Sequence, residues 1–225
     1  MLTDRDIEIL KLLVHYYVLS RQQIQRLLFP GDEKGRITRR RLQALVDEHL
    51  INRQTMLYCH PASGSPAPVY FPSRKGCEFL AEHLDDERFL ATPTQAPIPH
   101  HVLHWLAVSE THIVLDKALK SQTGVHCDGW LNEWDTVNKD ESAPEKRYRI
   151  YMLLREQPRL VCAPDAAFLL SVAGHRKVFY LEQDRTRRAC GRLRPARPKG
   201  TPSWPTRNST GAIFRRQRSI HSASS

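Results

Sequence analysis

The 225-residue chain is 40% hydrophobic and 26% charged, and it holds no run of roughly 18 apolar residues, so we expect a cytoplasmic protein without a membrane span. Its formal net charge of +10 comes from residues 185–225, which hold 11 Lys/Arg and no acid, so the total charge does not by itself indicate a nucleic-acid-binding fold. Five widely spaced cysteines without a Cys-x-x-Cys pair argue against a disulfide framework or a thiolate zinc site.

Two helices are predicted within the first 30 residues. Thr3 and Asp6 have the spacing of a capping box, and apolar residues then recur at helical intervals, so residues 4–17 are predicted to form the first helix. Ser20 and Gln23 form a second capping box, ahead of a short helix that ends at the next Pro-Gly pair. The chain is therefore expected to open with two helices joined by a short turn.

A third predicted helix follows the polar turn at residues 31–35 and carries a cluster of arginines. Four apolar residues recur at helical spacing and are expected to face inward: Ile37, Leu42, Leu45 and Val46. Four arginines are expected to face mostly outward: Arg36, Arg39, Arg40 and Arg41. Guanidinium groups can bridge phosphates or pair bidentately with guanine, so this stretch is the predicted DNA recognition helix.

The following segments are predicted to complete a winged helix-turn-helix domain over residues 1–84. Strand-like residues 50–58 and 69–71 flank a loop rich in Pro, Ser and Gly, which is typical of a β-hairpin wing. Ser73 can cap a fourth helix. Three helices, a hairpin and a closing helix in this order are the elements of that fold.

Further basic residues lie beside the predicted recognition helix. Arg53 falls in the predicted wing, and Arg74 and Lys75 follow it, so these three side chains are expected to add phosphate contacts. Phosphate contacts position a protein on DNA without reading its sequence. The alternative interpretation of all these cations is an ordinary solvated surface, since winged helices sometimes bind proteins instead of DNA.

The composition changes after residue 84. Residues 85–99 are acidic and then proline-rich, which indicates a linker. Helical and strand-like segments alternate over residues 100–186, which are predicted to form a partial α/β domain. Residues 187–225 lack acids and apolar periodicity and are rich in Arg, Pro and Ser, so we predict a disordered basic tail. The expected fold class of the whole chain is α+β.

An acidic pattern in the second predicted domain is similar to the metal-binding core of restriction-endonuclease-like nucleases. Pro164-Asp165 opens one apolar segment, and Glu182 and Asp184 end the next. Residues two apart on a strand face the same side, so Glu182 and Asp184 could converge with Asp165 on Mg²⁺. Asp184 stands where the nuclease pattern has a lysine, which removes the cation that stabilises the transition state. We therefore expect a region that does not cleave and needs no cofactor; Mg²⁺-dependent catalysis by these three acids is the alternative.

Three blocks of the sequence resemble the replication-relaxation family: residues 2–10, residues 69–76, and the pair formed by residues 164–168 and 181–186. The resemblance covers residues 2–186. It implies a winged-helix region joined to a degenerate nuclease-like region, and a role in replication or DNA relaxation of plasmids and integrative elements. It also implies Glu-x-Asp where nucleases have a lysine.

Three functions are compatible with these patterns. The favoured one is a double-stranded-DNA-binding accessory protein of plasmid or mobile-element replication, relaxation or mobilisation, with replication or mobilisation proteins as further partners. The second is a Mg²⁺-dependent DNA nuclease or nickase, and the third is a winged-helix transcriptional regulator. His100 and His104 lie one helical turn apart but lack an evident third ligand, so we expect polar residues at a helix start there.

Overall fold

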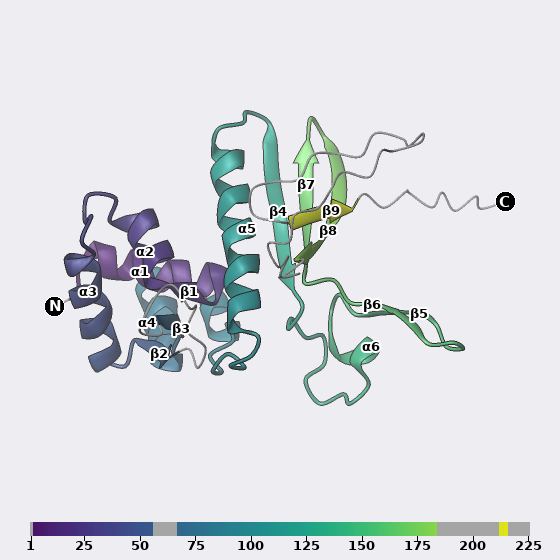
Figure 1. Ribbon diagram of the computed structural model, residues 1–225, viewed down its shortest axis with the longest axis horizontal. Helices are drawn as coiled ribbons and strands as arrows, with labels where there is room; N and C mark the ends of the chain where they lie inside the picture. Colours follow the sequence, from purple (N-terminus) through teal and green to yellow (C-terminus); the bar gives the residue numbers. More distant parts are fainter. Residues whose placement is uncertain (1, 56–66, 184–211, 216–225) are drawn as a thin grey trace, which may run out of the picture. The chain divides into compact units, whose positions relative to one another are not determined.

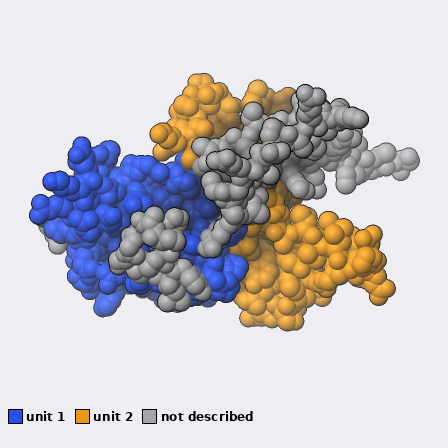
Figure 2. Space-filling view, in the orientation of Figure 1, with its two compact units in different colours: residues 1–113 blue, residues 114–225 orange. Residues whose placement is uncertain are grey.

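The computed structural model describes residues 2–55 and 67–183, together with the backbone of residues 212–215. The chain is α+β, with helices and small antiparallel sheets, as predicted. It divides into two compact units, Met1–Ile113 and Val114–Ser225 (Figures 1 and 2). Within the described ranges, no helix combines the length and the apolar character that crossing a membrane requires.

The chain opens with three short elements: α1 (Asp4–Tyr16), β1 (Leu19–Ser20) and α2 (Arg21–Leu28). Both predicted capping boxes are present. The Thr3 backbone N–H donates to Asp6 Oδ2 at 2.7 Å, and the Ser20 backbone N–H donates to Gln23 Oε1 at 2.9 Å. Each box satisfies amide groups that the first helical turn leaves without a partner, so the caps determine where both helices begin.

The rest of the predicted first domain contains two helices and two strands: α3 (Arg36–Asp47), β2 (Ile51–Thr55), β3 (Pro68–Pro72) and α4 (Arg74–Leu84). Strands β1, β3 and β2 form an antiparallel sheet in that order. Most of the predicted loop between β2 and β3 falls on residues 56–66, outside the described residues. Ser73 Oγ accepts a hydrogen bond from the Gly76 backbone N–H at 2.9 Å and caps α4 as predicted.

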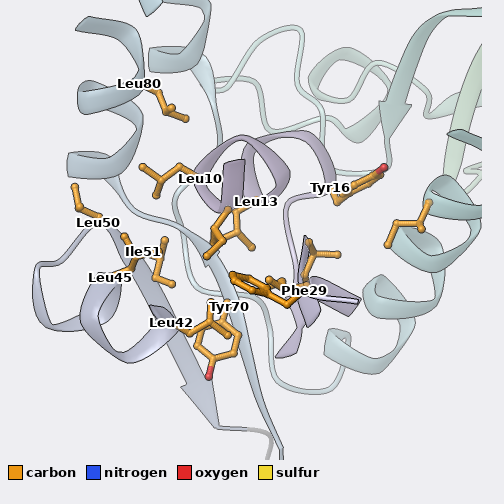
Figure 3. Packing of buried hydrophobic residues seen from close by; sticks show 14 residues of the cluster. Leu10, Leu13, Tyr16, Phe29, Leu42, Leu45, Leu50, Ile51, Tyr70 and Leu80 are labelled. Carbon is orange, nitrogen blue, oxygen red and sulfur yellow. The ribbon is translucent and has the colours of Figure 1, made fainter. Parts of the chain in front are cut away.

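One hydrophobic core joins the helices to this sheet (Figure 3). Its fully buried members come from α1, β1, α2, α3, β2 and α4 and include Ile9, Leu13, Leu19, Ile24, Leu42, Leu45, Ile51 and Leu80. Helix α4 packs closely against the backbone just before β2. A Cβ added at Gly76 would lie 2.0 Å from the Leu50 carbonyl oxygen. This core holds α3 rigidly, with one face inward and the other in solvent.

The first unit continues past residue 84, where the predicted linker begins. That segment contains the short 3-10 helix η1 (Glu87–Ala91), and the Tyr17 hydroxyl donates to the Gln95 carbonyl at 2.7 Å. Helix α5 (Val102–Lys120) follows, and Ser109 Oγ donates to the Tyr16 carbonyl at 3.1 Å. The compact unit therefore includes the predicted linker and the first part of α5.

The second unit contains an antiparallel sheet of four strands in the order β4-β7-β8-β9. The strands are β4 (Val125–Asn132), β7 (Ala166–Val172), β8 (His175–Gln183) and β9 (Ala212–Arg215). Three aromatic rings stack across it, with centroids 5.3 Å apart for Trp130 and Phe168 and 5.5 Å apart for Phe168 and Phe179. Strand β9 lies inside the stretch predicted as disordered, so the prediction of disorder is wrong for these four residues.

Three smaller elements lie between β4 and β7 in the sequence: α6 (Pro144–Arg147), β5 (Met152–Arg155) and β6 (Leu160–Cys162). Strands β5 and β6 pair with each other in a separate antiparallel sheet. Strands β6 and β7 are separated at Pro164-Asp165, the position at which an apolar segment was predicted to begin. Proline cannot donate a ladder hydrogen bond, which accounts for the break.

Candidate nucleic-acid interface

Three of the four predicted arginines lie on the solvent face of α3. Arg36, Arg39 and Arg40 are exposed, and none makes a side-chain hydrogen bond or ion pair within the described residues. Surface arginines commonly pair with a nearby carboxylate, so three unpaired guanidinium groups within five residues form a concentrated positive surface. We call Arg36, Arg39 and Arg40 the α3 arginine face.

Arg41 does not belong to this face, which corrects the prediction that it points outward. Its Nε donates to Asp6 Oδ1 at 2.8 Å, and its Nη2 pairs with Asp6 Oδ2. Asp6 is completely buried. Burial by itself would raise the pKa of Asp6, but hydrogen bonds from Arg41 and Thr3 outweigh it and hold the pKa below its ordinary value. A buried carboxylate requires such a partner, so Arg41 ties α3 to α1.

The rotation of α3 about its axis also differs from the prediction at Ile37 and Thr38. Ile37 was expected to face inward but is 48% exposed, whereas Thr38 is buried. The Thr38 backbone N–H and hydroxyl both donate to Asp32 Oδ2 at 2.8 Å, and the Arg36 backbone N–H donates to Asp32 Oδ1 at 2.9 Å. These bonds turn Thr38 inward and leave Ile37 among the exposed arginines.

The same three donors affect the acid–base chemistry of Asp32. Burial would raise the pKa of this carboxyl, but hydrogen bonds from Thr38 and from backbone N–H groups of the first helical turn lower it below its ordinary value. The ionised carboxylate therefore caps the N-terminus of α3, where negative charge is favourable. This cap defines the position of the first turn of α3, which carries Arg36 and leads to the other exposed arginines.

The other predicted DNA contacts have partners within the fold. Arg53 is exposed on β2, and its Nη1 donates to Oε1 of Gln43 on α3 at 2.9 Å, so it lies beside the α3 arginine face. Arg74 pairs with Glu78 one helical turn along α4 at 2.8 Å. Lys75 Nζ donates to the Glu48 carbonyl oxygen at 2.9 Å, just past the end of α3. Arg74 and Lys75 are both exposed.

Two of the three predicted acidic residues lie beside β7 and within β8 in the second unit. Asp165 immediately precedes β7, and its Oδ2 accepts the Gln183 backbone N–H at 2.5 Å. Glu182 is exposed, whereas Leu181 and Gln183 on either side are buried, so Glu182 lies on the opposite face of the strand from them. Asp184 lies outside the described residues.

A fourth acid, Glu133, lies close to Asp165 and was missed by sequence reasoning. Carboxylate oxygens of Glu133 and Asp165 lie within 4.8 Å of each other, and the Glu133 backbone N–H donates to the Asp165 carbonyl at 3.1 Å. Glu133 directly follows β4, which pairs with β7. Only this cross-strand pairing brings the two acids together, and no local sequence signal predicts it.

The protein is α+β: one unit carries an exposed arginine face without partners among the described residues, and the other contains a four-stranded antiparallel sheet. A family model described as replication-relaxation matches residues 10–194. The chain belongs to the replication-relaxation family, which links it to replication or relaxation of plasmids or mobile elements. The match starts later than the sequence resemblance and continues past Thr186. No curated protein and no solved structure matches the chain.

Proposed function

We propose that this chain is a double-stranded-DNA-binding accessory protein of plasmid or mobile-element replication, relaxation or mobilisation, and that it does not cleave DNA. In this proposal residues 1–84 act as a winged helix-turn-helix domain with α3 as the recognition helix. Replication or mobilisation proteins of the same element are the further partners. Family membership supports the biological setting, and the α3 arginine face supports the contact with DNA.

The order of elements in the first unit supports the winged-helix assignment. Helices α1, α2 and α3 precede the β2–β3 hairpin, and β1 pairs with β3 so that the sheet has the order β1-β3-β2. In helix-turn-helix proteins the second helix of the motif enters the major groove, and α3 occupies that place here. Its exposed surface is the part of the unit that such a fold presents to DNA.

The observation that carries this proposal is that Arg36, Arg39 and Arg40 have no side-chain partner within residues 2–55 and 67–183. An exposed arginine without a partner contributes little to the stability of the fold. The N–H donors of its planar guanidinium group are spaced to pair with phosphate oxygens or with guanine. Helix α3 is held in place by the Asp6–Arg41 pair and by the Asp32 cap. Rigid support of this kind presents the three side chains to DNA in one orientation.

We assign the flanking cations to phosphate contacts. Arg53 donates a hydrogen bond to Gln43 of α3, so it extends the α3 arginine face onto β2. Arg74 and Lys75 begin α4, and the Arg74–Glu78 pair is a solvent-exposed interaction that a phosphate can displace. These residues would position the domain, whereas base recognition would belong to α3.

The central experiment removes the α3 arginine face from the full chain. The triple variant R36Q/R39Q/R40Q is compared with R88Q/K117Q/K120Q, which removes three exposed cations outside α3. Fluorescence anisotropy with a labelled duplex is measured over a series of salt concentrations. We expect the α3 variant alone to lose affinity and to lower the slope of log K against log salt, by about one for each of its arginines that contacts a phosphate.

Equal losses from the two triple variants would show that the chain binds DNA only through its overall charge. Circular dichroism spectra of both variants provide the control for folding, since all six side chains are exposed. An unchanged affinity in the α3 variant would refute the proposal directly.

One observation favours the second function, a Mg²⁺-dependent nuclease. Glu133 and Asp165 bring two carboxylates within 4.8 Å, and Mg²⁺ commonly binds through one or two carboxylates together with water. Against it, the Asp165 carboxylate already accepts the Gln183 backbone N–H, and Asp184 replaces the lysine of the nuclease pattern. Supercoiled plasmid incubated with the protein and Mg²⁺ or Mn²⁺ separates the two functions, because only a nuclease converts it to nicked or linear DNA.

A further inference from the structure

Strands β5 and β6 form a two-stranded ribbon that pairs with no other strand in the described part of the chain. Figure 1 shows the ribbon running away from the four-stranded sheet of the same unit. An isolated two-stranded hairpin is marginally stable in water because it has no core of its own. A ribbon of this kind is therefore well suited to gain stability from a bound partner.

The ribbon exposes large apolar side chains. Leu154 is 60% exposed, Leu160 is 47% exposed and Val161 is 38% exposed. Leu160 lies opposite Arg155 in the antiparallel pairing, so apolar and cationic side chains share one surface. A cluster of exposed apolar residues on an element without a core indicates a binding surface.

The charge around the ribbon selects an anionic partner. Residues 145–159 hold five Lys/Arg and two Glu, whereas the rest of residues 114–183 holds five Lys/Arg and eight Asp/Glu. Lys146, Arg149, Arg155 and Arg159 are exposed. Among residues 114–183, the excess of positive charge therefore lies at α6 and the ribbon, whereas acids outnumber cations in the remainder.

The arginines at the tip are accessible to phosphate. In the part of the chain that the structure describes, Arg155 makes one side-chain hydrogen bond, from Nε to the Pro158 carbonyl at 3.3 Å. Arg159 is 57% exposed in its side chain, it has a side-chain hydrogen bond with Tyr151, and its pair with Glu145 is long at 3.4 Å. An exposed pair at that distance contributes little to stability, so a DNA phosphate can replace the carboxylate.

We propose that the β5–β6 ribbon is a second duplex-DNA-binding element of this chain, separate from the α3 arginine face. The major groove admits a two-stranded β-ribbon. Arg155 and Arg159 would bind phosphates, and Leu154 and Leu160 would contact sugars and base edges as apolar side chains of DNA-binding ribbons do. Two DNA-binding elements on one chain would allow it to contact two segments of a duplex.

The test uses the full chain and the double variant R155Q/R159Q, with K117Q/K120Q as the matched control in the same unit. We expect the ribbon variant to weaken duplex binding about tenfold and to lower the salt slope by about two, while the control leaves both unchanged. A second variant, R155K/R159K, keeps the charge and is expected to retain the salt slope, which separates phosphate binding from damage to the ribbon.

Two further measurements distinguish duplex DNA from other partners. L154S/L160S is expected to lower duplex affinity without changing the salt slope, because it removes no charge. Flotation with phosphatidylserine vesicles tests the other phosphate-bearing surface, and binding that R155Q/R159Q abolishes there but not on DNA would overturn the proposal. Unchanged DNA binding by R155Q/R159Q would also overturn it. If that result accompanies a loss of binding in R36Q/R39Q/R40Q, the ribbon alone is refuted and the function proposed for α3 stands.

Discussion

Arg40 and Arg41 are adjacent in α3 but lie in different environments. Arg40 is exposed and has no partner among the described residues, whereas Arg41 forms a two-bond ion pair with the fully buried Asp6. The partner lies 35 residues earlier in the chain and on another helix. The positive charge of this segment therefore divides into a structural part and a part that is available to DNA.

We predict that Arg41→Met lowers the free energy of unfolding by about 3 kcal/mol, because it leaves the buried Asp6 carboxylate without its ion pair. Arg40→Met is the matched control and should change stability by less than about 0.5 kcal/mol, since an exposed side chain without a partner contributes little. Urea denaturation of both variants measures the difference. Similar losses in the two variants would contradict the structural role of Arg41.

The pKa directions of Asp6 and Asp32 predict how stability depends on pH. Both carboxyls have a folded-state pKa below the ordinary value, so the unfolded chain binds protons first as the pH falls. The stability that they contribute is present above the ordinary pKa near 4 and is lost as the pH falls through the folded-state pKa. We expect the denaturation midpoint to decrease below about pH 4. Asp32→Asn should show a shallower decrease than the parent chain over the same range.

At the scale of elements, the turn before α3 determines where the arginine face begins. Gly35 has φ of 63° in the left-handed region, and an added Cβ would lie 2.3 Å from Arg21 Nη1. The Gly35 backbone N–H also donates to the Asp32 carbonyl at 2.8 Å. The turn therefore combines a backbone conformation that favours glycine with the residue that caps the helix.

We predict that Gly35→Ala destabilises the chain by about 1 kcal/mol, because alanine is strained at a positive φ. Gly31→Ala in the same turn is the control, since no atom lies within 4 Å of its added Cβ and it does not have a positive φ. Thermal melting monitored by circular dichroism compares the two. If both substitutions lower the melting temperature equally, the positive φ of Gly35 does not make alanine unfavourable at that position.

At the scale of the whole molecule, the last 41 residues contribute both charge and a strand. Residues 185–225 hold 11 Lys/Arg and no acid, and β9 within them pairs with β8 over four residues. Removing this segment takes away cations that can neutralise phosphates without reading bases. It also turns β8 into an edge strand with unpaired backbone groups.

We predict that a chain ending at Gln183 binds duplex DNA with a smaller salt slope, keeps its preference among DNA sequences, and melts at a lower temperature than the full chain. The lower melting temperature follows from the lost β8–β9 hydrogen bonds, each of which contributes about 1 kcal/mol. A chain ending at residue 215 keeps β9 and is the control, with a melting temperature expected to match the full chain. Coincident melting curves for all three chains would show that β9 contributes no stability.

The sequence by itself determined the α+β class, the family and the boundaries of most elements in the first unit. The caps at Thr3, Ser20 and Ser73 were readable because a capping side chain bonds to a residue only three positions away. The arginine cluster could be predicted from the sequence for a similar reason. Helical spacing alone places Arg36, Arg39 and Arg40 near one another.

Only the tertiary structure decided which side of α3 faces the core and which acids lie together. Asp6 draws Arg41 inward from a distant helix, Asp32 turns Thr38 inward in place of Ile37, and strand pairing brings Glu133 to Asp165. The Asp6–Arg41 and Glu133–Asp165 contacts join residues more than 30 positions apart, and Asp32 lies in the turn before α3, so helical or strand periodicity relates none of these pairs. Periodicity predicts that a segment has two faces, but the partners of buried charges decide how that segment is turned.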